Sequence, residues 1–291
     1  MPNDIFLADS GIPYIAAYPW DAGFGAKYAN PSTPVAGFGY AVALSPSNED
    51  IAIAHNTSPY ISVYPWDAGF GAKYANPSTL PTGNGQGVAF SPLGTDIAVS
   101  HTVSPYVTAY PWAAGFGAKY ANPSTLPTGM GDEVEFSPSG EDIAVAHDVS
   151  PYVTAYPWAA GFGAKYTNPL IKPPGECWGV NFSPSGADIA VAHILTPYVT
   201  AYPWSAGFGG KYTDPSTLPA GNSRHVAFSP SGADIAVAHA VSPFVTAYPW
   251  SAGFGAKYAN PSTLPTSSIN YVAFSNLVVG KIDYLPVMGL H

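Results

Sequence analysis

Residues 88 to 133 read VAFSPLGTDIAVSHTVSPYVTAYPWAAGFGAKYANPSTLPTGMGDE, and this 46-residue unit decides the fold. The pattern returns along the 291 residues with a tryptophan at every 46th position, each inside a Tyr-Pro-Trp triplet: Trp20, Trp66, Trp112, Trp158, Trp204 and Trp250. A repeat of this length is typically one supersecondary unit that cannot bury its apolar face alone. The chain therefore consists of six units that must stack on one another.

Each unit predicts four short strands. Val88 to Phe90 is an apolar run that ends in the turn Ser91-Pro92-Leu93-Gly94, and Ile97 to Ser100 is its expected hairpin partner. β-Branched and aromatic residues predict a third strand from Tyr106 to Tyr110, and Phe116 to Tyr120 predicts a weaker fourth. No apolar period of 3.6 residues persists, so no helix is expected.

Four short antiparallel strands per repeat are typical of a β-propeller blade, so we expect an all-β, six-bladed propeller. The segments VAFSPSGADIAVAH and YVTAYPW resemble the WD40 and YVTN-type propeller repeat, in which an apolar-Ser-Pro-x-Gly hairpin joins the first two strands. Two features differ, because no Gly-His dipeptide consistently precedes the first strand and Tyr-Pro-Trp replaces the Trp-Asp ending. These differences predict that aromatic packing replaces the hydrogen-bonded tetrad of WD40 blades. The near-identical repeats also resemble those of tailed-bacteriophage and environmental viral proteins.

The two ends of the chain predict how the ring closes. Asp4-Ile5-Phe6-Leu7 aligns with the second strand of the unit, and the last copy of the first strand is Val272 to Phe274. We therefore expect one propeller domain over residues 1–276, closed by pairing of the N-terminal and C-terminal strands, which removes open sheet edges. Residues 277–291 break the repeat as an apolar extension, which we expect to pack on the propeller or to mediate self-association.

Composition narrows the class of partner. The formal net charge is −9, and six of the nine basic residues are a single lysine per repeat, so no basic cluster is available for nucleic acid or an anionic membrane. No stretch has the length of a membrane span, so no membrane insertion is expected. The first residues do not resemble a signal peptide, which leads us to expect a cytoplasmic location or a place within a virion. Cys177 is the only cysteine and cannot form an intrachain disulfide.

Comparison of the six copies with one another gives the clearest indication of function. Most positions are nearly identical, but the five positions before each first strand differ between copies. The first strand of a propeller blade lines the central channel, so these six loops are expected to converge at one mouth of that channel and form a binding site there. The predicted ligand-binding residues are Tyr40, Gln86, Asp132, Trp178, Arg224 and Asn270, with Glu133, Glu176, His225 and Tyr271 beside them.

Two sets of repeated polar residues have a structural interpretation. The first is a histidine at the end of the second strand, and equivalent atoms in adjacent blades lie on the order of 10 Å apart, too far to share a metal ion that needs ligands at about 2 Å. We expect each imidazole to hold the following Ser-Pro-Tyr loop by hydrogen bonds. The second is an aspartate at the start of the second strand, which we expect to fix the hairpin backbone. The sets are His55, His101, His147, His193 and His239, and Asp4, Asp50, Asp96, Asp142, Asp188 and Asp234.

The sequence favours a non-enzymatic binding or interaction scaffold whose partner is a protein or a glycan. It contains no phosphate-binding loop, no Gly-x-Ser-x-Gly and no His-Glu-x-x-His, so we expect no catalytic residues, no metal and no cofactor. Two alternatives remain open. One is a lactonase-like hydrolase that uses the central pocket. The other is a multivalent lectin with one site per blade, built from outward-facing copies of Trp112, Lys119, Tyr120 and Asn122, unless these rings fill the space between blades.

Overall fold

The computed structural model describes residues 3–8, 11–20, 24–265, 267 and 269–274. Within them the chain forms 17 strands in six antiparallel sheets and no helix. The strands are β1 Asn3–Ala8, β2 Ile15–Trp20, β3 Gly39–Leu44, β4 Asp50–His55, β5 Ile61–Pro65, β6 Gly85–Phe90, β7 Asp96–His101, β8 Val107–Pro111, β9 Gly131–Phe136, β10 Asp142–His147, β11 Val153–Pro157, β12 Cys177–Phe182, β13 Asp188–His193, β14 Val199–Pro203, β15 Ser223–Phe228, β16 Asp234–His239 and β17 Val245–Pro249.

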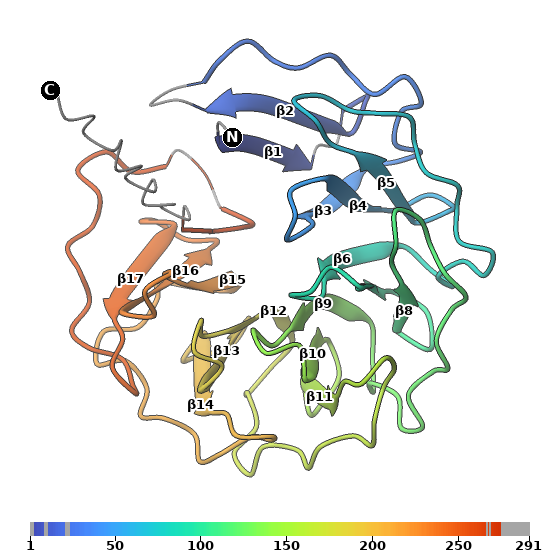
Figure 1. Ribbon diagram of the computed structural model, residues 1–291. Helices are drawn as coiled ribbons and strands as arrows, with labels where there is room; N and C mark the ends of the chain where they lie inside the picture. The colour runs from blue at the N-terminus through green and yellow to red at the C-terminus, as the bar shows by residue number, and fades with distance from the viewer. Residues whose placement is uncertain (1–2, 9–10, 21–23, 266, 268, 275–291) are drawn as a thin grey trace, which may run out of the picture.

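The sheets stand side by side around a common centre, as blades of a propeller do (Figure 1). Blade 1 is β1–β2, and blades 2 to 6 are β3–β5, β6–β8, β9–β11, β12–β14 and β15–β17. The first strand of each of blades 2 to 6 lies innermost, and from blade 2 to blade 6 each of these strands contacts the first strand of the next blade (Figure 1). The all-β propeller arrangement predicted from the repeat is thus confirmed.

The prediction of four strands per blade is wrong for the described residues, since each of blades 2 to 6 has three. In blade 3 the predicted fourth strand, Phe116 to Tyr120, forms no ladder with its neighbour. The backbone pairing consists of an isolated bridge between Trp112 and Phe116 and of a hydrogen bond from the Tyr120 amide to the Ala109 carbonyl. Pro111 has no amide hydrogen, so the ladder cannot continue past the bridge. Gly117 is needed there because a Cβ atom on it would lie 2.9 Å from the ring of Pro111.

Strand pairing of the two ends is not seen in the described residues. β1 pairs with β2 in the register that β4 keeps with β5, so the N-terminal segment does take the place of a second strand. Residues 271–274 form no strand, and β1 has no partner besides β2 within the described part of the chain. The apolar extension predicted over residues 277–291 lies outside the described residues.

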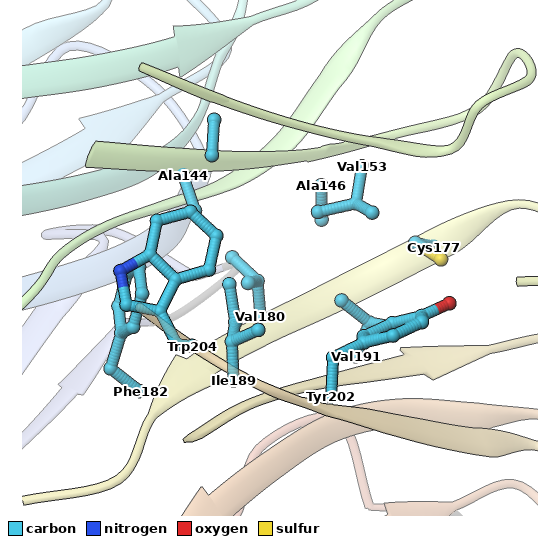
Figure 2. Packing of buried hydrophobic residues seen from close by; sticks show 11 residues of the cluster. Ala144, Ala146, Val153, Cys177, Val180, Phe182, Ile189, Val191, Tyr202 and Trp204 are labelled. Atoms are coloured by element: carbon cyan, nitrogen blue, oxygen red, sulfur yellow. The ribbon is translucent and has the colours of Figure 1, made fainter. Parts of the chain in front are cut away.

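The hydrophobic core lies between blades and not within them. The cluster in Figure 2 joins Ala144 and Val153 of blade 4 to Val180, Tyr202 and Trp204 of blade 5, and all of these side chains are buried. Equivalent clusters lie between blades 1 and 2, 2 and 3, 3 and 4, and 5 and 6. Each blade therefore depends on its neighbour for burial, which is why the unit must repeat.

The repeated aspartates do not act as predicted, because their carboxylates join neighbouring blades. Asp142 of blade 4 accepts a hydrogen bond from the Tyr166 hydroxyl at 2.6 Å and one from the Trp204 indole of blade 5 at 2.9 Å. The hairpin backbone is held instead by serine, since Ser137 Oγ accepts the amide of Asp142 at 3.0 Å. A hydrogen-bonded Asp-Tyr-Trp set thus accompanies the aromatic packing that the sequence predicted.

The repeated histidines are buried inside their blades. His101 Nδ1 lies 2.7 Å from the carbonyl of Val103, and its Nε2 lies 2.9 Å from the hydroxyl of Thr108. His193 makes the same two contacts in blade 5, so the predicted role in holding the loop after the second strand is confirmed there. Burial lowers the pKa of His55, His101, His147 and His193 to about 4, which keeps these rings neutral at pH 7.

Candidate functional site at the central mouth

The predicted site residues of blades 2 to 6 share one unusual backbone feature. Each is the extra residue of a β-bulge, because the register with the second strand shifts at its position: Tyr40 in β3, Gln86 in β6, Asp132 in β9, Trp178 in β12 and Arg224 in β15. They therefore lie on strands and not, as predicted, in the preceding loops. A bulge turns a side chain away from the ladder, and bulges are common beside functional sites.

The structure brings three of the six predicted residues together. The guanidinium carbon of Arg224 lies 5.5 Å from the centre of the Trp178 ring, a cation–π arrangement. An Nη atom of Arg224 donates to the Asn270 side-chain oxygen at 2.7 Å. Tyr40 is half-exposed, and neither it nor Gln86 makes a side-chain hydrogen bond within the described residues. The contacts among the predicted site residues are therefore confined to blades 5 and 6 and the 269–274 segment.

Asp132 lies in an acidic environment. Burial and the nearby carboxylates of Asp148, Glu176 and Glu133 raise the pKa of Asp132 to about 8. Its Oδ2 atom is buried and has no hydrogen-bond partner in the described residues. The same holds for Nε of Arg224, a donor. Buried polar atoms are nearly always paired, so an unpaired acceptor and an unpaired donor at one mouth indicate that something else completes them.

Glu133 and His225 connect the inner strands of blades 4, 5 and 6. Glu133 Oε2 accepts the Val180 amide of blade 5 at 2.7 Å, and its Oε1 lies 3.0 Å from His225 Nε2 of blade 6. Glu133 can pass over blade 5 because Gly179 has no side chain, and a Cβ atom there would lie 3.3 Å from Glu133 Oε2. The sequence placed Glu133 and His225 near the site but could not predict that they meet.

The segment 269–274 occupies the innermost place beside blade 6. His225 Nδ1 accepts the Val272 amide at 3.4 Å, and the Tyr271 ring stacks on the His225 ring at a centroid distance of 3.7 Å. The same spacing of 47 residues joins the Asn181 side chain to the Phe228 amide at 3.0 Å. Residues 271 and 272 therefore stand to blade 6 as the first strand of blade 6 stands to that of blade 5.

Half-exposed apolar side chains of blades 3 to 6 lie beside the segments that lead into the inner strands. Equivalent positions in the loops after β7, β10, β13 and β16 carry Val103, Val149, Leu195 and Val241, each about half exposed. These loops lie against the segments that lead into the inner strands, since a Cβ atom on Gly129 would lie 2.7 Å from Val149. We did not predict these side chains, although an apolar residue before Ser-Pro or Thr-Pro recurs in these four copies.

Within the described residues no cluster of three or more His, Cys, Asp or Glu side chains could hold a metal ion. The same residues contain no helix long and apolar enough to cross a membrane.

Known proteins resemble this chain in fold only. No protein-family model matches the sequence, and no curated protein matches it. A crystal structure of a "putative 6-phosphogluconolactonase" from Bacteroides uniformis matches with a TM-score of 0.66 at 14% identity, over 88% of this chain and 79% of that chain. Hydrazine synthase from Kuenenia stuttgartiensis matches with a TM-score of 0.62 at 16% identity, over 81% of this chain and 70% of that chain. At identities this low, the two matches support the propeller architecture and say nothing about the function of this chain.

Proposed function

We propose that this protein is a binding scaffold that docks a polypeptide segment of a partner protein at the central mouth. The observation that carries the proposal is that two buried atoms at that mouth, Oδ2 of Asp132 and Nε of Arg224, have no hydrogen-bond partner among the described residues. A peptide group or a polar side chain offers a donor for the first and an acceptor for the second. The apolar side chains of Val103, Val149, Leu195 and Val241 would add the contact area that such a segment needs.

The types of side chain at the mouth favour a role in recognition over random sequence change between the repeats. Trp178 and Arg224 already stack on each other, so the arginine is ordered before a partner arrives. Tryptophan and arginine are the residue types that most often dominate binding energy. A viral structural or host-recognition setting is part of the same proposal.

An array of short synthetic peptides of varied charge tests the proposal. We expect a subset of peptides to bind the unmodified protein and to lose binding to the double variant Trp178→Ala/Arg224→Ala. The matched control is Leu93→Ala/Glu141→Ala, which changes one apolar and one charged side chain in exposed hairpins at the opposite end of the strands. Equal binding by all three proteins would refute a site at the mouth.

A lactonase-like hydrolase is the second candidate. It is favoured by the fold likeness to the Bacteroides uniformis structure and by Glu135, whose pKa is raised to about 8 by burial and by Glu133. A protonated carboxyl beside a second carboxyl is a common acid–base arrangement. One observation argues against a hydrolase. Both ring nitrogens of His225 already interact with Glu133 and Val272, so this imidazole has no free nitrogen to act as a general base. Hydrolysis of glucono-δ-lactone that is lost in Glu135→Gln would favour this candidate over the scaffold.

A further inference from the structure

The rim of the propeller contains a pocket that repeats between blades. One pocket, of about 350 Å³, lies between blades 3 and 4 and is lined by Tyr120, Ala121 and the 159–163 loop. Another, of about 400 Å³, lies between blades 5 and 6 and is lined by Tyr212, Thr213 and the 252–256 loop. The two sets of residues are equivalent after a shift of two repeats. Both volumes fall in the range of small-molecule sites.

The loop that forms one wall of the pocket is held in a costly backbone conformation. Ala160 has φ of +52° and Gly161 has φ of +137°, and the alanine repeats this angle at Ala68, Ala114, Ala206 and Ala252. A residue with a Cβ atom in the left-handed region is strained, and such strain tends to occur where a ligand is held. Glycine would relieve it, yet alanine is kept in all five copies.

The same loop contains two backbone donors that have no partner within the described residues. The Ala159 amide bonds to the Gly161 carbonyl at 3.2 Å and the Gly163 amide to the Pro157 carbonyl at 2.8 Å. The amides of Ala160 and Gly161 donate no hydrogen bond to any described residue. The opposite wall is aromatic, since a Cβ atom on Gly161 would lie 3.8 Å from the Tyr120 ring.

The pockets carry no unpaired charge. The lining between blades 3 and 4 is entirely uncharged, and Asp214 in the other pocket is paired with Lys211. The repeated tryptophans take no part, because Trp112, Trp158, Trp204 and Trp250 are each only 5–6% exposed, which removes the outward-facing tryptophan that a lectin site was predicted to use.

We propose that these rim pockets bind a neutral polyhydroxylated ligand, the terminal sugar of a glycan, with one weak site at each blade boundary that carries the strained alanine. The apolar face of a sugar suits the tyrosine and phenylalanine rings, and its hydroxyls can accept from the free amides. Several weak sites on one rigid ring bind a surface with many copies of the sugar far more tightly than they bind one sugar. The pockets are separate from the central mouth, so this proposal does not depend on the proposed function.

Amide-resolved NMR titration with methyl glycosides of neutral hexoses and N-acetylhexosamines tests the proposal. We expect at least one glycoside to shift the amide signals of Ala160, Gly161, Ala252 and Gly253. In the variant Ala121→Trp/Thr213→Trp, which fills the two pockets from exposed or rim positions, these shifts should vanish while Tm stays within a few degrees. The control Leu93→Trp/Leu170→Trp adds two tryptophans at positions 82% and 94% exposed outside the pockets and should titrate like the unmodified protein.

Three results would overturn the proposal: no shifted signal with any glycoside, shifts confined to the mouth residues, or shifts at the rim that survive in the filled-pocket variant. A glycan array gives the second readout. Binding to immobilised neutral glycans should exceed the affinity for the free glycoside by roughly 10²- to 10⁴-fold.

Discussion

The indole nitrogen of Trp112 donates a hydrogen bond to Oδ2 of Asp50, 62 residues earlier and in the neighbouring blade, at 2.9 Å. The other oxygen of Asp50 accepts from the Tyr74 hydroxyl at 2.7 Å. The same pair of bonds recurs for Asp96, Asp142 and Asp188. One carboxylate per repeat thus fixes both its own outer segment and the next blade, which gives the ring a regular blade-to-blade connection.

Removing one such carboxylate should weaken the ring. In Asp50→Ala the buried Trp112 indole keeps no acceptor, and a buried unpaired donor costs about 1–3 kcal/mol. Chemical denaturation should show this loss in the free energy of unfolding. The neighbouring exposed residue supplies the control, since Glu49→Ala should change stability by no more than about 0.5 kcal/mol. Equal effects of the two substitutions would contradict the role of Asp50.

Truncation should reveal whether residues 271–274 close the ring. A chain ending at residue 266 loses the contacts of Tyr271 and Val272 with His225 and leaves the inner side of blade 6 uncovered, so it should unfold at lower temperature and aggregate. A chain ending at residue 276 keeps those contacts and should be clearly more stable than the shorter one. Calorimetry and light scattering compare them. A chain ending at 266 that stays monomeric with an unchanged Tm would show that closure does not use this segment.

Stability should be greatest near pH 6.5. Four buried histidines have a pKa lowered to about 4, so the unfolded chain binds more protons as pH falls below about 6.5, and stability is lost there. Asp132 and Glu135 have a pKa raised to about 8, so the folded chain holds protons that the unfolded chain releases, and stability is lost as pH rises toward 8.

The variant Asp132→Asn/Glu135→Gln isolates the alkaline side of this profile. It keeps both side chains neutral, so its Tm should stay nearly level between pH 6.5 and 8 while that of the unmodified protein falls. Below pH 6.5 the variant should lose stability more steeply than the unmodified protein. In the unmodified protein the two neutral carboxyl groups hold protons that the unfolded chain releases down to about pH 4, and this offsets part of the loss that the histidines cause. An alkaline loss of the same size in both proteins would rule out these carboxyl groups as its cause.

Much of the architecture could be predicted because it is local. The Ser-Pro-x-Gly turn and the β-branched run of Val107–Pro111 determine strands within a few residues, and the 46-residue period extends them around the ring. The missing fourth strand depends on a contact between Gly117 and Pro111, and the aspartate bonds reach across 62 residues. Such distant contacts have no signature in a single repeat.

The site was predicted in part for the same reason. Differences between the repeats identify the mouth positions, since the equivalent residues around a single site each contact a different part of the ligand and need not be identical. They do not indicate which of these positions touch. That Arg224 meets Trp178 and Asn270, and that Gly179 lets Glu133 reach His225, follows from the β-bulges and from strand spacing, which the sequence does not specify.

If Asp132 takes part in recognition, binding at the mouth should depend on pH. A donor group of the partner binds best to the ionised carboxylate, so a partner must displace a proton below a pKa of about 8. The affinity of an array-selected peptide should therefore rise between pH 6 and pH 8, and Asp132→Asn should remove that rise. Fluorescence anisotropy at several pH values measures both, and an unchanged pH profile in the variant would exclude Asp132 from the contact.

A crystal structure of the protein with the tightest-binding array peptide tests the central claim most directly. The account predicts that the peptide lies over the mouth, with an acceptor within hydrogen-bond distance of Arg224 Nε and a donor at Asp132 Oδ2, the two atoms that find no partner among the described residues. A peptide seated at the rim or on the opposite face, with both atoms still unpaired, would contradict it.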